Sequence, residues 1–405
     1  MTSRRLNIIN KLKARFPKKT ITFNDHTIPD WFNSEGLPLS VKGQNNRYLV
    51  PWDEGVCNKT FWQFLQWRKE RFLNNNNTEL DNSAAFMPNV YDPVRAGSLT
   101  PTTNSNPVKL TWIGHSTTLV QMGNFTILTD PVLSARCSPS QLVGTHRYVD
   151  AAVSVDDLPK DINIVLISHD HYDHLDIDTI TALGVDRPQI QYYVPMGTKD
   201  LLVNSCGIKE NYVREMVWWQ ETKFESADTN AKIVCTPAQH WCSRTPFDRN
   251  KRLWCSWVVH TGNENESEKE SENGRFFFGG DTGRPKHFPL YSLIGQKYGP
   301  FHLSALPVGA YSPTWFMSPA HCGPDEAIQI HQDLKSEQSV GIHWGTFPLA
   351  DEPYFEPAQL LKRFCLEAGI SFEKEFVLLR LGETLLSGED NKTSEKLKTL
   401  LDCEL

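Results

Sequence analysis

The stretch SHDHYDHLD, residues 168–176, decides how the rest of this chain is interpreted. It holds three histidines and three aspartates, and it directly follows NIVLI, residues 163–167, an apolar run that is typical of a buried strand. Four of its side chains form the pattern H-x-H-x-D-H: His169, His171, Asp173 and His174. Imidazole and carboxylate are ligands that Zn²⁺ prefers, with iron and manganese as competitors. The stretch therefore predicts a metal-binding loop at the end of a strand.

The spacing of these residues indicates two metal ions rather than one. In a compact loop, residues 169 and 171 can face one ion, while residues 173 and 174, at the first turn of the next helix, can face a second. Further candidates follow later predicted strands: His240 after KIVCTPAQ, Asp281 after RFFFGG and His343 after SVGI. A single histidine beside a tryptophan is more often a core residue. Together, however, the three candidates offer one more imidazole for each ion and one carboxylate that can bridge them.

Strands alternate with helices through the second part of the chain. KLTWIGHSTTLVQM followed by NFTILTD predicts a β-hairpin that turns at Gly123-Asn124. Further strands are predicted at 163–168, 191–195, 232–237, 253–260, 275–280, 303–308 and 339–344, and helices at 177–183, 198–205, 324–336 and 356–368. Strands that recur with helices between them favour an α/β fold in which helices cover the sheets.

Composition divides the chain into four parts. These are a basic N-terminal segment (1–46), a helical segment with a linker (47–107), the catalytic domain (108–388) and a C-terminal tail (389–405). Within the catalytic domain, NENESEKESEN at 263–273 interrupts two strands and predicts an acidic surface loop.

Two N-terminal features leave several interpretations open. Residues 1–19 carry basic side chains and no acid, which suits a solvated tail, a segment that faces anionic lipid, or a mitochondrial transit peptide. A helix is predicted at 59–73, where Trp and Phe occur all round and Lys and Arg occur toward the end. Such a helix either packs on the core or lies at a membrane interface.

The overall composition limits the functional classes. Of the 405 residues, 39% are hydrophobic and 22% are charged, as in soluble globular proteins. No run approaches the roughly 20 apolar residues of a membrane-spanning helix. The formal net charge of -7 gives no support to nucleic-acid binding. The nine cysteines include no CxxC pair, which indicates reduced thiols in a cytosol-facing compartment.

The order of the candidate ligands resembles that of the metallo-β-lactamase superfamily, in which H-x-H-x-D-H is followed by His, Asp and His. The resemblance implies an αβ/βα four-layer sandwich with a binuclear metal site. It assigns to one ion His169, His171 and His240. It assigns to the other ion Asp173, His174 and His343, with Asp281 as the bridge. The implied cofactor is two Zn²⁺ ions per chain, or another divalent transition metal.

Longer segments are similar to the N-acylphosphatidylethanolamine-hydrolysing phospholipase D family, over about residues 47–382. Among these segments are TWIGHSTTLVQM, ILTDPVLSARCSPSQLVGTHR, TPAQHWCSRT, GPFHLSALPVGAYSPTWFM and GIHWGTFPLADEP. The resemblance implies a phosphodiester hydrolase that releases N-acylethanolamine and phosphatidic acid from a membrane phospholipid. It also implies a homodimer that is peripheral on cytosol-facing membranes of the Golgi, endosomes or nuclear envelope, and a mitochondrial location is not excluded.

A binuclear site suits this reaction. A divalent ion lowers the pKa of a bound water from 15.7 to about 7, and two ions about 3.5–4 Å apart neutralise the oxygens of the diester. We therefore expect a hydroxide held by both ions to attack phosphorus directly, with no covalent enzyme intermediate.

The resemblance also implies roles for residues around the metals. The expected catalytic residues are His321 and Asp281, with His321 at the mouth of the site as a substrate contact or a proton donor to the leaving alkoxide. Asp130 and His115 are expected close to the ligands, with Asp130 orienting a ligand imidazole through its second nitrogen. Further candidate substrate contacts are Tyr172, Arg244 and Trp315. Arg244 suits either a lipid phosphate or a structural salt bridge equally well.

One departure from the family and two alternative functions remain open. Ser312 and Thr314 stand where the family leads us to expect charged residues, so the head-group contacts are not inferred. One alternative is another hydrolase of the superfamily, such as a lactonase, thioesterase or nuclease. The other is a membrane-associated protein without catalytic activity that keeps an idle metal site.

Overall fold

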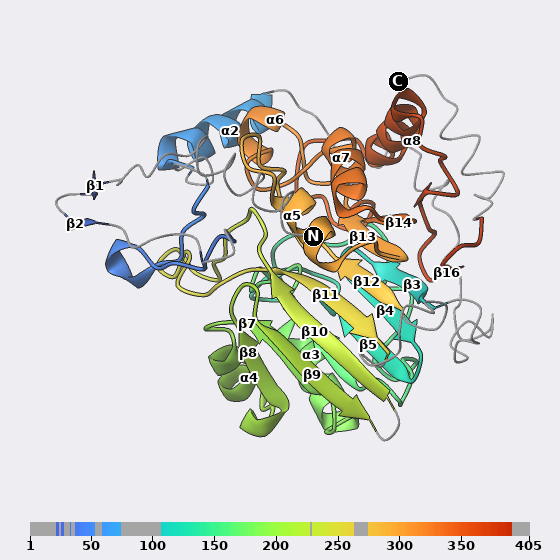
Figure 1. Ribbon diagram of the computed structural model, residues 1–405. Helices are drawn as coiled ribbons and strands as arrows, with labels where there is room; N and C mark the ends of the chain where they lie inside the picture. The colour runs from blue at the N-terminus through green and yellow to red at the C-terminus, as the bar shows by residue number, and fades with distance from the viewer. Residues whose placement is uncertain are drawn as a thin grey trace.

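Two seven-stranded sheets form the centre of the structure, a computed structural model (Figure 1). The first sheet has the order β16 (Thr384–Leu386), β3 (Lys109–Gly114), β4 (Thr117–Met122), β5 (Phe125–Thr129), β6 (Ile164–Leu166), β7 (Gln191–Pro195) and β8 (Val213–Met216). The second has the order β15 (Phe376–Val377), β14 (Ser339–Ile342), β13 (Leu303–Pro307), β12 (Arg275–Phe278), β11 (Ser256–Thr261), β10 (Thr229–Thr236) and β9 (Glu221–Ser226). A separate pair consists of β1 (Thr22–Phe23) and β2 (His26–Thr27).

The structure describes residues 22–23, 26–27, 33, 37–52, 59–73, 107–226, 229–262 and 274–390. Several sequence-based predictions therefore lie outside the described residues. These are the basic segment 1–19, the linker from 74 to 106, the acidic loop 263–273 and most of the C-terminal tail.

Alternate side chains of the first sheet enter two different cores. Val120 and Met122 of β4 lie in a core cluster with Val234 and Phe277 of the second sheet. Leu119, which directly precedes Val120 and therefore points to the opposite face of the strand, belongs to the cluster on the other face of the sheet. Because both faces are covered, the central strands consist of buried residues throughout, which is why they read as continuous apolar runs in the sequence.

Helices cover the outer faces of both sheets (Figure 1). On the first sheet, α3 (Ile177–Asp186) and α4 (Lys199–Cys206) place Ile180 and Leu202 in one cluster with Val165 of β6. On the second sheet, α7 (Pro324–Leu334) contacts β13 and packs between α5 (Leu290–Tyr298) and α8 (Glu356–Ala368). This arrangement confirms the predicted αβ/βα sandwich.

The predicted hairpin is wrong in one place that matters for the site. The stretch 109–122 is not one strand, because the structure breaks it into β3 and β4 at His115 and Ser116. Gly114 and His115 have φ angles of +139° and +51°, a backbone conformation that turns the chain. The turn leaves His115 buried at the end of β3 instead of in the middle of a sheet.

The helix α5 has no counterpart among the predicted elements. Gly295 lies within it, and glycine lowers helix propensity by about 1 kcal/mol relative to alanine, which weakens the sequence signal. The structure shows why glycine stands there: a Cβ atom at this position would lie 2.3 Å from the Asp333 carbonyl oxygen of α7. The close approach of α5 and α7 therefore requires glycine, a residue that lowers the helix propensity of the sequence.

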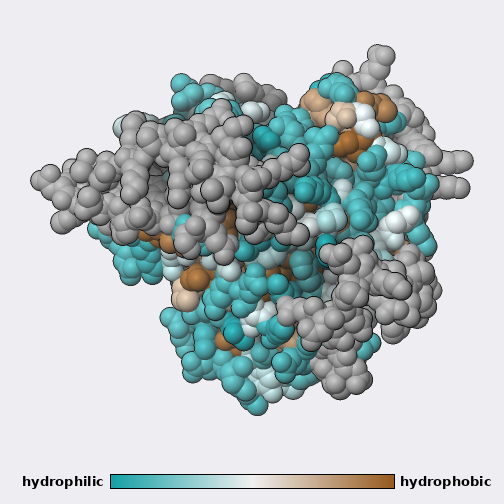
Figure 2. All heavy atoms as spheres, in the orientation of Figure 1, coloured by the Kyte–Doolittle hydropathy of each residue, from teal (hydrophilic) through white to brown (hydrophobic). Residues whose placement is uncertain are grey.

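The predicted N-terminal helix is present as α2 (Phe61–Leu73). Its Trp67 ring stacks on Phe316 of α6 (Thr314–Met317) at 5.2 Å, and Trp67 Nε1 donates to Asp351 Oδ2 at 2.9 Å. By contrast, Trp62 is 76% exposed. No helix in the described ranges is long and apolar enough to cross a bilayer. The face seen in Figure 2 is mostly hydrophilic, with separate brown patches, one of them over α8.

Candidate metal centre

The predicted ligands lie where strands of both sheets end at one edge of the sandwich. In the first sheet, β5 and β6 are parallel, so Asp130 and the loop 169–174 leave the same edge. In the second sheet, β12, β13 and β14 are parallel, so Asp281 and His343 leave together. β10 has the same direction because β11 is antiparallel to both β10 and β12, which brings His240 to that edge. Segments more than 170 positions apart thus contribute to one site.

Three imidazoles and one carboxylate oxygen converge in a first group. His169 Nε2 lies 2.8 Å from His171 Nδ1, and His240 Nε2 lies 3.3 Å from the same atom. Asp281 Oδ2 lies 3.9 Å from His169 Nε2 and 3.6 Å from His240 Nε2. This is the set that the sequence assigns to one ion, with the addition of Asp281.

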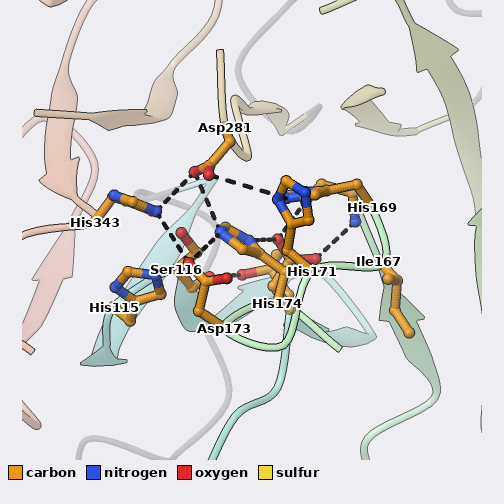
Figure 3. Close-up of polar contacts among 12 residues, drawn as sticks. His115, Ser116, Ile167, His169, His171, Asp173, His174, Asp281 and His343 are labelled. Carbon is orange, nitrogen blue, oxygen red and sulfur yellow. Dashed lines mark hydrogen bonds and ion pairs between the residues drawn. The ribbon is translucent and has the colours of Figure 1, made fainter. Parts of the chain in front are cut away.

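A second group lies on the other side of Asp281. Its Oδ1 lies 3.2 Å from His174 Nε2 and 2.9 Å from His343 Nε2. Asp173 Oδ2 lies 3.4 Å from His174 Nε2 and 3.6 Å from His343 Nε2. Asp281 therefore presents one oxygen to each group, as Figure 3 shows, which is the position of a bridging carboxylate.

Several buried oxygen and nitrogen atoms at this site have no hydrogen-bond partner among the described residues and are suited to bind a cation. Both Asp281 oxygens and the Nε2 atoms of His174 and His343 are buried and have no hydrogen-bond partner in the described part of the chain. Buried polar atoms without partners cost free energy, and facing imidazole lone pairs repel one another unless a cation lies among them. Nitrogen and carboxylate donors are the set that divalent transition metals prefer. These residues would hold such ions.

Hydrogen bonds on the far sides of the rings fix three of the five imidazoles. Asp130 Oδ2 lies 2.6 Å from His174 Nδ1, which turns Nε2 toward Asp281. His240 Nδ1 lies 2.9 Å from the Ala320 carbonyl oxygen, and His169 Nδ1 lies 3.0 Å from Ser168 Oγ. Outer partners of this kind orient metal-binding histidines and set their tautomers. The structure thus places Asp130 where the sequence leads us to expect it.

Close packing between the two sheets holds the loop 169–174 in place. Cys255 N donates to the Ser168 carbonyl oxygen at 2.9 Å, and Trp257 Nε1 donates to that of Ile167 at 2.9 Å. Gly280, just before Asp281, has φ +57°, and a Cβ atom there would lie 2.5 Å from Ser168 Cβ. Only glycine therefore allows the strand ends of the two sheets to approach closely enough to share ligands.

The two additional predicted histidines lie at opposite ends of the centre. His115 Nε2 lies 3.0 Å from Asp173 Oδ2, and both its backbone N–H and its carbonyl group are bonded, to Thr346 Oγ1 and Trp112 Nε1 respectively. His321 Nδ1 lies 3.7 Å from Asp281 Oδ2, and the side chain is 14% exposed. His321 is therefore close enough to the bridge to touch a substrate, while His115 supports Asp173 from within the protein.

Two of the three remaining candidate substrate contacts, Tyr172 and Arg244, are engaged with the protein itself. Arg244 Nη1 donates to the carbonyl oxygens of Asp170 and Leu175 at 2.9 Å each, and its guanidinium lies 4.0 Å from the centre of the Tyr172 ring. Tyr172 OH donates to the Arg244 carbonyl oxygen. This pair braces the metal-binding loop from both ends. The third candidate, Trp315, is 41% exposed.

Burial and the carboxylates set the protonation of the centre. Burial lowers the pKa of His171 and of His321 to about 4 and that of His115 to about 3, so these imidazoles are neutral at pH 7. At His343 burial also acts to lower the pKa, but the Asp281 and Asp173 carboxylates raise it to about 9. Although burial opposes it, the neighbouring imidazoles hold the pKa of Asp281 well below its usual range. Metals bind neutral imidazole and ionised carboxylate, so an ion that binds at His343 must displace a proton from that ring.

Three neighbours of the ligands were not predicted from the sequence. Ser168 donates through its backbone N to Asp130 Oδ1 at 2.7 Å, and Arg252 pairs with the buried Asp170 at 2.8 Å. The Trp241 ring lies 4.3 Å from that of His171. Ser168 and Trp241 stand beside ligands in the sequence, which is a usable signal. The pairing of Arg252 with Asp170 spans 82 positions of the sequence, so no local sequence signal predicts it.

Comparison with known proteins agrees with this fold and centre. A family model described as a β-lactamase superfamily domain matches residues 126–344. Among solved structures, an isothiocyanate hydrolase from Delia radicum gut bacteria superposes with a TM-score of 0.50 at 20% identity, covering 68% of this chain and 98% of that one. This second likeness shows the fold alone. The fold and the centre define a metal-dependent hydrolase of the β-lactamase superfamily, with a site for a divalent metal.

Two curated relatives narrow the family. N-acyl-phosphatidylethanolamine-hydrolyzing phospholipase D 1 of Caenorhabditis elegans is 39% identical over 67% of this chain and 74% of its own length. The mitochondrial N-acyl-phosphatidylethanolamine-hydrolyzing phospholipase D of Saccharomyces cerevisiae is 34% identical over 69% of this chain and 56% of its own length. The chain belongs to this phospholipase D family.

Proposed function

We propose that this chain is a phospholipase D that hydrolyses N-acylphosphatidylethanolamines to N-acylethanolamines and phosphatidic acid, with two Zn²⁺ ions as cofactors. The observation that carries the proposal is the pair of ligand groups that share Asp281. The similarity to two named phospholipases of this specificity supports the choice of substrate.

The arrangement of the centre suits attack on an anionic diester. When bound, two divalent ions activate water at neutral pH and offset the charge of the phosphate oxygens. Asp281 fixes the separation of the two groups, and Asp130 holds His174 in position through Nδ1. His321, at the exposed side of Asp281, contacts the phosphate or donates a hydrogen bond to the leaving oxygen.

A lipid assay with metal analysis tests the proposal. The full chain is incubated with an N-acylphosphatidylethanolamine in mixed micelles, and both products and bound metal are quantified. We expect two metal ions per chain and equal release of N-acylethanolamine and phosphatidic acid. Metal without lipid cleavage would indicate another hydrolase of the superfamily, and absence of metal would indicate a protein without this catalytic activity. A phosphatidyl group trapped on the protein in a single turnover would contradict direct attack.

We further propose that α2 and α6 dock the enzyme on the surface of a lipid bilayer. The substrate carries acyl chains, and each CH₂ group brought into water costs about 0.8 kcal/mol, so the active site must approach the membrane. Trp62, Phe64 and Leu65 of α2 are exposed, as is Trp315 of α6. Lys59, just before α2, donates to the Trp315 carbonyl oxygen at 3.4 Å, so the start of α2 lies beside α6. Arg68 and Lys69 are exposed on the same helix and suit anionic head groups.

Replacement of Trp62 by Ser tests the docking surface. We expect about tenfold weaker partitioning onto anionic liposomes, because a largely exposed indole that enters the interface contributes about 1.5 kcal/mol or more. Leu366→Ser is the matched control, since Leu366 is 69% exposed on α8. Trp67 is left intact because it anchors α2 to Asp351. Equal co-sedimentation of Trp62→Ser, Leu366→Ser and the unmodified chain would remove α2 from the docking surface.

We also propose that the chain forms a homodimer and that it lies on intracellular membranes. A homodimer would present two such surfaces to one bilayer, and sedimentation equilibrium measures whether the chain dimerises. The proposed location is the cytosol-facing side of intracellular membranes. A mitochondrial location has support from the name of the yeast relative and from the basic residues 1–19.

A further inference from the structure

A small cavity lies beside His343, a member of the second ligand group. Its volume is about 20 Å³, enough for one water molecule. Among the residues that line it are His343, Trp344 and Glu352. None of the three belongs to an exposed surface: His343 and Trp344 are 3% and 5% exposed, and the Glu352 carboxylate accepts hydrogen bonds from the protein interior.

Two polar atoms beside this cavity have no partner in the described part of the chain. These are Nδ1 of His343 and Nε1 of Trp344, both of them buried. Because His343 Nε2 faces Asp281 and Asp173, the proton of a metal-binding His343 must lie on Nδ1. Two of the residues that line the cavity therefore each carry a buried N–H donor that needs an acceptor.

Glu352 is the acceptor that the cavity offers. Its Oε1 accepts from Ala310 N at 2.5 Å and its Oε2 from Ser312 N at 3.1 Å, which leaves further lone pairs on both oxygens. No direct bond joins Glu352 to His343, but a water can accept from two N–H groups and donate to a carboxylate at the same time.

We propose that this cavity holds a water molecule that accepts from His343 Nδ1 and Trp344 Nε1 and donates to Glu352, so that Glu352 is a positioning residue for the His343 metal ligand. The other imidazoles with far-side partners already show the principle, with Asp130 behind His174 and the Ala320 carbonyl oxygen behind His240. Here the carboxylate acts through one water, and it also fixes the loop that leads to α6. Glu352 thus ties the ligand to a segment beside the proposed docking surface.

Zinc titration of the Glu352→Gln variant tests this inference, which rests on the proposed metal centre but not on the proposed substrate. The unmodified chain is first titrated with Zn²⁺ against a competing chelator, and two bound ions are expected. In Glu352→Gln, the affinity for one ion should fall about 10–100-fold while that for the other is kept, because only one group contains His343. Failure of the unmodified chain to bind two ions would overturn the centre itself, whereas equal affinities in both proteins would overturn only the role of Glu352.

A matched control separates positioning from support of the loop. Tyr311 OH donates to Glu356 Oε1 at 2.6 Å, so Tyr311→Phe loosens the same 310–312 loop without touching Glu352. It should lower the melting temperature but leave both zinc affinities unchanged. If Tyr311→Phe weakens zinc binding as much as Glu352→Gln does, the effect belongs to the loop. A crystal structure of the zinc-loaded unmodified chain should show an ordered water within hydrogen-bond distance of His343 Nδ1 and Glu352, and density without it would also overturn the proposal.

Discussion

Asn in place of Asp281 is expected to lower kcat/KM for the N-acyl phospholipid by at least about 10³-fold. Loss of an outer partner of a metal ligand typically costs 10–100-fold, and Asp281 contributes one oxygen to each of the two ligand groups. An amide has one oxygen and no charge, so it cannot serve both groups. Turnover in mixed micelles and metal content by atomic emission measure the effect, and fewer than two ions per chain are expected.

A matched carboxylate shows whether this effect is specific. Asp333 also lies in an ion pair, with Arg284 at 2.9 Å, and it belongs to neither ligand group. Asp333→Asn should keep both ions and nearly all of the activity. Undiminished turnover in the Asp281→Asn variant, with two ions still bound, would show that the shared carboxylate has no part in the reaction.

Removal of the metal is expected to abolish hydrolysis and to destabilise the fold. Ions that bind the native state stabilise it by about 2.7 kcal/mol per site when the free ion is 100-fold above its Kd. The site also gathers buried carboxylate and imidazole atoms that lose their counter-charge on chelation. Activity, and the melting temperature by calorimetry, should both fall after exhaustive dialysis against a chelator and return on addition of Zn²⁺.

The Asp281→Asn variant provides the internal comparison for this experiment. Because it should already bind fewer ions, its melting temperature should fall less on chelation than that of the unmodified chain. Activity that survives complete removal of metal from the unmodified chain would rule out the proposed chemistry. A return of activity with Mn²⁺ or Co²⁺ in place of Zn²⁺ would leave the centre intact and change only the identity of the ion.

Local pattern was enough to predict the elements that carry the site. The apolar run before SHDHYDHLD, and the strands before His240, Asp281 and His343, are buried on both faces, so their composition alone marks them as strands. The residue types at their ends then specify a metal, because few other functions need imidazole and carboxylate at this spacing. The break at His115 escaped prediction because its turn depends on backbone angles, and residue types alone do not fix those angles.

By itself, the sequence determined which side chains could bind metal, on which strand ends they stand, and to which superfamily their order belongs. Only the tertiary structure decided that Asp281 presents one oxygen to each ligand group, that Arg244 braces the loop through backbone carbonyls, and that Glu352 and His343 line one small cavity. The physical reason is the distance along the chain between the residues that determine each property. Strand periodicity and ligand chemistry are properties of adjacent residues, whereas a shared oxygen, a buried guanidinium or a water-sized cavity exists only where distant segments are packed together.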